Sequence, residues 1–189
     1  MATARSQVGR IIAALVLPWI ALGIAATEQA SASISICFSP MEPCDERIVK
    51  WLDTATVSID LAAYDFTLDA LAHHLLVKAR TIPVRVIADR RQAHGSHSLL
   101  PMLIRASNDP KLKLKLSVRF GKQRGIMHHK FTILDHRRLE TGSFNYTNNA
   151  SRNNQENQVY LDEAETVKRF SEHFDRMWKA AKTATLRTE

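Results

Sequence analysis

Short apolar runs alternate with longer amphipathic segments along most of this chain, and this alternation restricts the possible folds more than any other feature. Apolar runs of strand length occupy residues 34–38, 57–63 and 84–88. Segments with helical periodicity occur at residues 45–55, 68–79 and 99–106. Repeated β–α units of this kind predict an α/β sandwich, in which helices flank a β-sheet.

The second half of the chain adds antiparallel strands to this pattern. Residues 126–134 and 139–141 are expected to form a β-hairpin, and residues 159–161 a last strand. A closing helix is expected at residues 164–181, because large apolar side chains recur there at helical spacing. We therefore expect a mixed β-sheet.

Leucines and lysines alternate where the two halves meet. On a strand, one face would carry Leu112, Leu114 and Leu116, and the other Lys111, Lys113 and Lys115. The lysine face suits the phosphate backbone of a nucleic acid. A solvated edge strand, protected from aggregation by its charge, explains the pattern equally well.

The first 32 residues have the features of a secretory signal peptide. Two arginines precede an almost unbroken apolar run at residues 11–26, and Ala30-Ser31-Ala32 offers the small residues of a signal-peptidase site. We expect cleavage after Ala32, with an uncleaved membrane anchor as the alternative. Residues 33–189 then make one domain of ordinary size, either periplasmic or secreted.

The exported part is basic and contains both cysteines. Its 24 basic and 18 acidic residues give a net charge of +6. This charge favours polyanionic partners but does not choose between nucleic acid and anionic lipid. Cys37 and Cys44 stand seven residues apart in a chain expected to meet an oxidising compartment, which favours a disulfide. Zinc is the poorer explanation, because no histidine stands nearby at ligand spacing.

The clearest catalytic chemistry lies in the predicted hairpin, at His128-His129-Lys130. Side chains two residues apart on a strand share a face, so His128 and Lys130 point the same way and His129 points to the other side. A histidine can attack phosphorus and hold it as a covalent phosphoramidate. Lys130 would stabilise the charge on the phosphoryl oxygens.

The return strand brings further polar groups toward the same end of the sheet. Ser143 and Asn145 can donate hydrogen bonds to phosphoryl oxygens, and Gly142 lets the backbone come close. The remaining histidines have ordinary explanations: His73, His74 and His173 fall on predicted surface helices. His94 and His97 lack an acidic or thiol partner for a metal.

Taken together, the spacing H-x-K-x(4)-D-x(6)-G-S-x-N is carried by His128, Lys130, Asp135, Gly142, Ser143 and Asn145. This pattern resembles the signature of the phospholipase D superfamily. The chain looks like the small bacterial endonucleases of this superfamily, which have one copy of the motif. The similarity extends to Tyr64-Asp65-Phe66 and to Glu156-Asn157. Six fixed positions are far more specific than a two-histidine pattern.

The resemblance implies a phospholipase D-like sandwich with its active site at a homodimer interface, because the family needs two facing motifs and this chain has one. His128 would be the nucleophile in one subunit and the proton donor in the other. Lys130 and Asn145 of both subunits would clamp the phosphate, Glu156 would hydrogen-bond the histidine ring, and Asp135 would organise the site. No metal or cofactor is expected.

Three functions remain to be distinguished. A nuclease that cleaves DNA or RNA without a metal is favoured by the cations that precede the motif, which could line a groove: Lys111, Lys113, Lys115, Arg119, Lys122 and Arg124. A phospholipase acting on anionic lipids would use the same chemistry, but no apolar, aromatic-rich loop is evident for membrane insertion. A non-catalytic nucleic-acid-binding protein is disfavoured by the complete motif.

Overall fold

The computed structural model describes residues 32–121 and 124–186. The predicted signal peptide therefore lies almost wholly outside the described residues, as does Lys122. Among the helices in the described ranges, none combines the length and the apolar character needed to cross a membrane.

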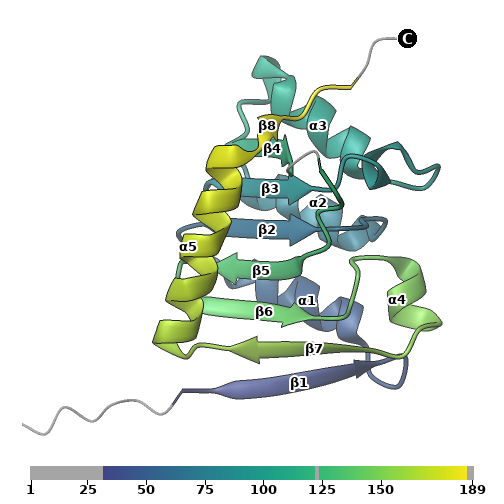
Figure 1. Ribbon diagram of the computed structural model, residues 1–189, viewed down its shortest axis with the longest axis vertical. Coiled ribbons are helices and arrows are strands. Elements are labelled where there is room, and N and C mark those ends of the chain that lie inside the picture. Colours follow the sequence, from purple (N-terminus) through teal and green to yellow (C-terminus); the bar gives the residue numbers. More distant parts are fainter. Residues whose placement is uncertain (1–31, 122–123, 187–189) are drawn as a thin grey trace, which may run out of the picture. The chain divides into compact units, whose positions relative to one another are not determined.

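The described residues form one mixed sheet of eight strands (Figure 1). Its order is β1-β7-β6-β5-β2-β3-β4-β8, in which β2, β3 and β4 are parallel and the other neighbours pair antiparallel. The strands are β1 (Ile34–Ser39), β2 (Ile59–Ala63), β3 (Val84–Ala88), β4 (Leu116–Phe120), β5 (Lys130–Leu134), β6 (Arg138–Gly142), β7 (Glu156–Leu161) and β8 (Lys182–Thr183).

Helices cover both faces of this sheet, which confirms the predicted sandwich (Figure 1). Helices α1, α2 and α3 lie behind the sheet, the long helix α5 crosses its front, and the short helix α4 lies beyond one end of the strands. Their bounds are α1 (Cys44–Asp53), α2 (Asp69–Lys78), α3 (Leu100–Asn108), α4 (Asn148–Arg152) and α5 (Ala164–Ala180).

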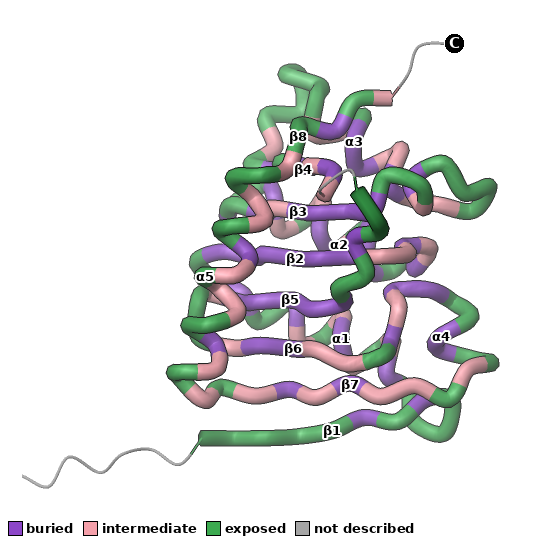
Figure 2. Tube along the Cα trace, viewed as in Figure 1, coloured by how far each residue is buried: buried purple, intermediate pink, exposed green. Residues whose placement is uncertain are grey.

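Each helix packs through the apolar stripe that its sequence predicts. In α1, Ile48 and Leu52 are fully buried, one turn apart. In α5, Val167 and Phe174 are buried against the front of the sheet, where Phe131 of β5 completes the cluster. The central strands are buried along their whole length because helices cover both of their faces (Figure 2).

The register brings one end of four neighbouring strands together. Ala63 is paired with Ala88 on one side and with Lys130 on the other, and Ala88 is paired with Phe120. The carboxyl ends of β2, β3 and β4 therefore meet the start of β5. The direction of the strands also changes between β2 and β5, and ligands of α/β proteins bind at the carboxyl ends of strands near such a change.

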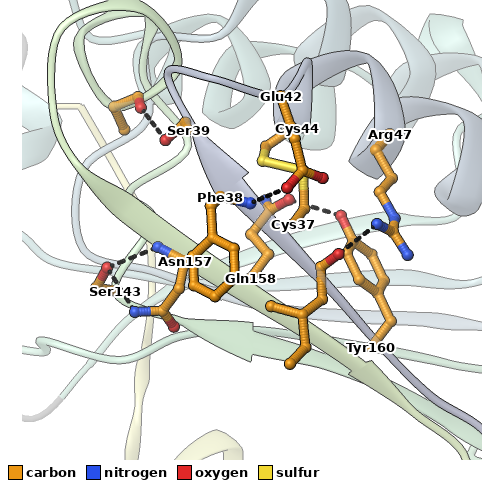
Figure 3. Close-up of a disulfide and its surroundings, with 12 residues drawn as sticks. Cys37, Phe38, Ser39, Glu42, Cys44, Arg47, Ser143, Asn157, Gln158 and Tyr160 are labelled. Carbon is orange, nitrogen blue, oxygen red and sulfur yellow. Dashed lines mark hydrogen bonds between the residues drawn. A yellow bond between two sulfur atoms is a disulfide. The ribbon is translucent and has the colours of Figure 1, made fainter.

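Strand β1 forms one edge of the sheet and is fixed to α1 by the predicted disulfide. Cys37 and Cys44 are bonded, with their Cα atoms 5.8 Å apart (Figure 3). Arg47 of α1 donates a hydrogen bond of 2.6 Å to the carbonyl of Ile36. Three apolar side chains of this edge, Ile34, Ile36 and Phe38, remain exposed (Figure 2).

The predicted lysine-faced strand is wrong. Residues Pro110–Leu112 form a short 3-10 turn, in which the Asp109 carboxylate accepts a hydrogen bond from the Lys111 N–H. Lys113 then adopts a left-handed backbone with φ of 50°. The strand begins only at Leu116, so the alternation of leucine and lysine does not define two faces of a strand.

Candidate active site

The two leading motif residues meet at the start of β5. His128 lies just before the strand rather than on it, and Lys130 is its first residue. Lys130 Nζ lies 3.2 Å from Nε2 of His128 and donates a hydrogen bond of 3.0 Å to the carbonyl of His128. A histidine ring nitrogen can accept a hydrogen bond from an ammonium group only through its lone pair. A nucleophilic nitrogen needs the same lone pair to attack phosphorus.

Lys130 is buried while His128 is exposed, so the site has a covered cation beneath an accessible imidazole. Loss of water lowers the pKa of Lys130, and the Glu156 carboxylate nearby opposes this effect. The Tyr64 ring supports both groups: it meets the His128 ring edge-on at 4.4 Å, and Lys130 Nζ lies 5.1 Å from its centre. Tyr64 thus limits the orientations of the imidazole.

A buried aspartate that the sequence did not single out holds the loop before His128. Asp89 follows β3, and one of its carboxylate oxygens accepts a hydrogen bond of 2.9 Å from the Met127 N–H. Its other oxygen accepts from the N–H groups of Arg91 and Gln92. Gln92 in turn donates to the Tyr64 hydroxyl. Only the position of Asp89 after a buried strand could have indicated this role.

The return strand supplies the rest of the motif. A Cβ atom on Gly142 would lie 2.0 Å from the carbonyl oxygen of Asn157, so glycine is needed for β6 to approach β7. Ser143 follows and is exposed, while the buried side-chain oxygen of Asn145 has no hydrogen-bond partner among the described residues. Asn145 therefore has an unused hydrogen-bond acceptor beside the site.

Within the described chain, Glu156 forms no hydrogen bond with the His128 ring. Its carboxylate accepts hydrogen bonds from the Ser143 hydroxyl, at 2.5 Å, and from the Asn154 side chain, at 3.0 Å. Ser143 is also bonded to the Asn157 N–H (Figure 3). Glu156 therefore fixes the serine of the motif.

One cavity of about 830 Å³ unites these residues with helix α5. His128, Lys130, Gly142, Ser143 and Asn145 line it from the sheet side. The opposite wall is the face of α5 that carries Thr166, Arg169, Phe170, Glu172, His173 and Arg176. The sequence pattern indicated the buried side of α5 but gave no sign that its other side faces the motif.

The prediction that His129 faces away from the site is wrong, whereas His173 lies on a surface helix, α5, as predicted. His129 also lines the cavity, and its Nε2 atom lies 3.2 Å from Nε2 of His173 on α5. Packing in this position removes water and lowers the pKa of His129, and His173, Lys130 and His128 add to the effect. His128 precedes the regular strand, so the alternation of strand faces does not apply to its neighbour.

Asp135 lies at the far end of β5, about 16 Å of strand from Lys130. Its carboxylate accepts hydrogen bonds from the backbone N–H groups of Thr56, Val57 and Ser58, before β2, and from Arg138. These bonds lower its pKa, although its burial acts in the opposite direction. The structure does not bring this motif residue to the site.

Most of the cations expected to line a substrate groove also lie elsewhere. Lys111, Lys113 and Lys115 precede β4, at the end of the sheet opposite His128. Arg119 donates a hydrogen bond to the Trp178 carbonyl and stacks on that ring. Arg124 is exposed in the loop between β4 and β5, on the side of the site.

Comparison with known proteins identifies the family. Residues 48–178 match the family model described as "Cardiolipin synthase, PLD-like domain". The chain belongs to the phospholipase D superfamily.

Within the described residues, no group of three or more His, Cys, Asp or Glu side chains is arranged to hold a metal ion.

Curated relatives within the superfamily have two kinds of name. A "Phospholipase D" of Rickettsia conorii is 32% identical over 78% of this chain and 70% of its own length. The human "Mitochondrial cardiolipin hydrolase" is 34% identical over 70% of this chain and 50% of its own length. The chain thus spans about half of the human relative.

Solved structures confirm the phospholipase D-like fold and the resemblance to small single-domain members. Nuc from Salmonella typhimurium, a phospholipase D family member, has a TM-score of 0.72 and 27% identity, over 82% of this chain and 99% of Nuc. NucT from Helicobacter pylori has a TM-score of 0.71 and 24% identity, over 81% of this chain and 99% of NucT. This chain is a phosphodiesterase of the phospholipase D superfamily.

Proposed function

We propose that the protein is an exported endonuclease that cleaves DNA or RNA without a metal ion. The observation that carries the proposal is the single cavity in which His128, Lys130 and Ser143 face two arginines of α5. An accessible imidazole beside a buried ammonium suits an anionic phosphodiester, and further cations at the rim suit a substrate with more than one phosphate. The likeness to Nuc supports a nuclease.

The reaction would proceed in two displacements at phosphorus. In the first, the His128 ring nitrogen forms a bond to phosphorus while the bond to the leaving oxygen breaks, and that oxygen takes a proton from a second imidazole. In the second, water attacks phosphorus and loses its proton to that second imidazole, and the bond to His128 breaks. Lys130 and Asn145 would bind the phosphoryl oxygens in both steps.

The second imidazole would be His128 of another copy of this chain. The chain has one motif, and a two-fold axis beside the cavity would bring two exposed His128 rings together. The side-chain N–H groups of Asn145 would then donate hydrogen bonds to a phosphate shared by both subunits. Residues 1–32 would direct export to the periplasm or the medium, where the disulfide persists.

A phospholipase is the second candidate function. It is favoured by the names of the curated relatives, phospholipase D and mitochondrial cardiolipin hydrolase. The same cavity residues would then act on the phosphodiester of a lipid headgroup. An anionic lipid would also be attracted by the basic character of the chain, so charge does not separate the two candidates.

The deciding experiment compares three substrates in the presence of EDTA. Purified protein, a His128→Ala variant and a His73→Ala control would be assayed on plasmid DNA, RNA and cardiolipin vesicles. His73 is an exposed histidine of α2, on the other face of the sheet. We expect nucleic acid cleavage that His128→Ala abolishes and His73→Ala leaves intact. Cleavage of lipid alone would favour the phospholipase, and binding without turnover an accessory protein.

A further inference from the structure

The α5 wall of the cavity carries cations that the motif does not include. Arg169 and Arg176 line the cavity with His173 between them, at spacings of four and three residues. Such spacings place the three side chains on one face of a helix. The face is therefore a row of basic groups directed at the same space as His128.

The two arginines are available for a ligand. Both are exposed, and neither forms an ion pair with any described residue. In contrast, Arg85 is bound to Asp60 and Asp175, and Arg138 to Asp135. One acidic side chain, Glu172, also lines the cavity, so the α5 wall keeps a positive balance.

The histidine contact fixes this row relative to the reacting group. His173 on α5 meets His129, the immediate neighbour of His128, with 3.2 Å between their Nε2 atoms. Phe170 adds an edge-on contact with Phe131 of β5, with ring centres 5.1 Å apart. The helix is therefore held against the segment that carries the nucleophile.

We propose that Arg169 and Arg176 bind the phosphates that flank the scissile phosphodiester of a polynucleotide. The two residues are about 10 Å apart along the axis of α5, about three times the axial rise of about 3.4 Å per phosphate in one strand of a duplex. They therefore reach phosphates other than the one at His128. This assignment rests on the proposed nuclease function and replaces the lysines at residues 111–115 as the substrate-binding cations.

A salt titration tests the assignment. Binding of fluorescent DNA and RNA oligonucleotides would be measured in a His128→Ala background, alone and with Arg169→Ala, Arg176→Ala or both. Each arginine removed should weaken binding about 3- to 20-fold and reduce the slope of log affinity against log salt by about one unit. Lys168→Ala is the matched control, because this exposed lysine of α5 does not line the cavity.

A second measurement separates binding from chemistry. With His128 intact, the arginine variants should raise KM on polynucleotide much more than they reduce activity on bis(p-nitrophenyl) phosphate, which has one phosphate. An unchanged salt slope, or an equal loss on both substrates, would overturn the assignment. If the His128→Ala protein binds cardiolipin vesicles and no oligonucleotide, the nuclease proposal itself fails, and the assignment fails with it.

Discussion

Two carboxylates, those of Asp135 and Glu140, show how position in this fold sets the charge of a side chain. Asp135 is surrounded by backbone N–H groups and Arg138, which lower its pKa. Glu140 of β6 is fully buried, and this burial raises its pKa to about 8, although the Tyr146 hydroxyl donates a hydrogen bond to it. Asp135 is thus held as an anion and Glu140 as a neutral acid at neutral pH.

Replacing Asp135 should reduce stability and leave the chemical step nearly unchanged. Because its pKa is lowered in the folded state, its stabilisation is present above about pH 4 and is lost as the pH falls through the lowered value. Asp135→Asn keeps the shape of the turn, and Asn tolerates the positive φ of 56°. We expect a loss of about 1–3 kcal/mol at pH 7, which shrinks toward pH 2. Urea unfolding at several pH values measures it, and a loss of kcat without loss of stability would contradict it.

Replacing Glu140 should affect stability as the pH rises, whereas the contribution of Asp135 is lost as the pH falls. The folded state keeps the proton of Glu140 up to about pH 8, whereas the unfolded chain releases it near pH 4.5. Its contribution is therefore lost as the pH rises from 4.5 to 8. The Glu140→Gln side chain cannot ionise. Between pH 5 and pH 8, the free energy of unfolding of this variant relative to the wild type should therefore rise by about 2–4 kcal/mol. Urea unfolding of both proteins at pH 5 and at pH 8 measures this change. A difference in free energy of unfolding that is the same at both pH values would refute the assignment.

At the scale of elements, the disulfide is the covalent tie between an edge strand and its neighbouring helix. A cross-link that closes a loop of this size contributes about 2–3 kcal/mol by restricting the unfolded chain. A Cys37→Ala, Cys44→Ala double variant should lose about that amount, measured by thermal or urea unfolding. Adding a reductant should destabilise the wild type and have no effect on the variant. Equal stability of the two oxidised proteins would contradict this.

The sequence predicted elements whose patterns are local and missed those that tertiary packing decides. The buried face of α5 follows from the periodicity of its aromatic side chains, and the hairpin of β5 and β6 from its apolar runs. The alternation at residues 111–116 was misleading because an aspartate-capped turn competes with strand pairing there. The contact between His129 and His173 depends on how α5 crosses the sheet, which no local pattern encodes.

The motif residues show the same difference between what local sequence predicts and what tertiary packing decides. Spacing alone identified His128, Lys130 and Asn145, and the structure brings them to one cavity. It places Asp135 just beyond the other end of β5, because the four strand residues after Lys130 lie between them. Asp89 and Tyr64 support the site through contacts that only the folded chain reveals.

At the scale of the whole molecule, the proposed dimer makes a sharp kinetic prediction. Subunits with two different tags, one wild type and one His128→Ala, would be coexpressed and the mixed dimer purified through both tags. If each subunit supplies one imidazole to a shared site, the mixed dimer should keep less than about a tenth of the activity. Independent subunits would keep about half. A strictly monomeric, fully active protein would exclude the shared site altogether.

The pairing of β1 with β7 has a consequence for the order in which the molecule folds. Ile34 pairs with Leu161, so β1 finds its partner only after about 127 further residues have been made. Contacts of such long range form slowly. Strand β7 also carries the Asn157 carbonyl that holds Ser143 and Phe144 in place. The chain thus acquires a finished reaction centre only after β7 has been made, and a growing chain that stops before β7 would have no phosphodiesterase activity.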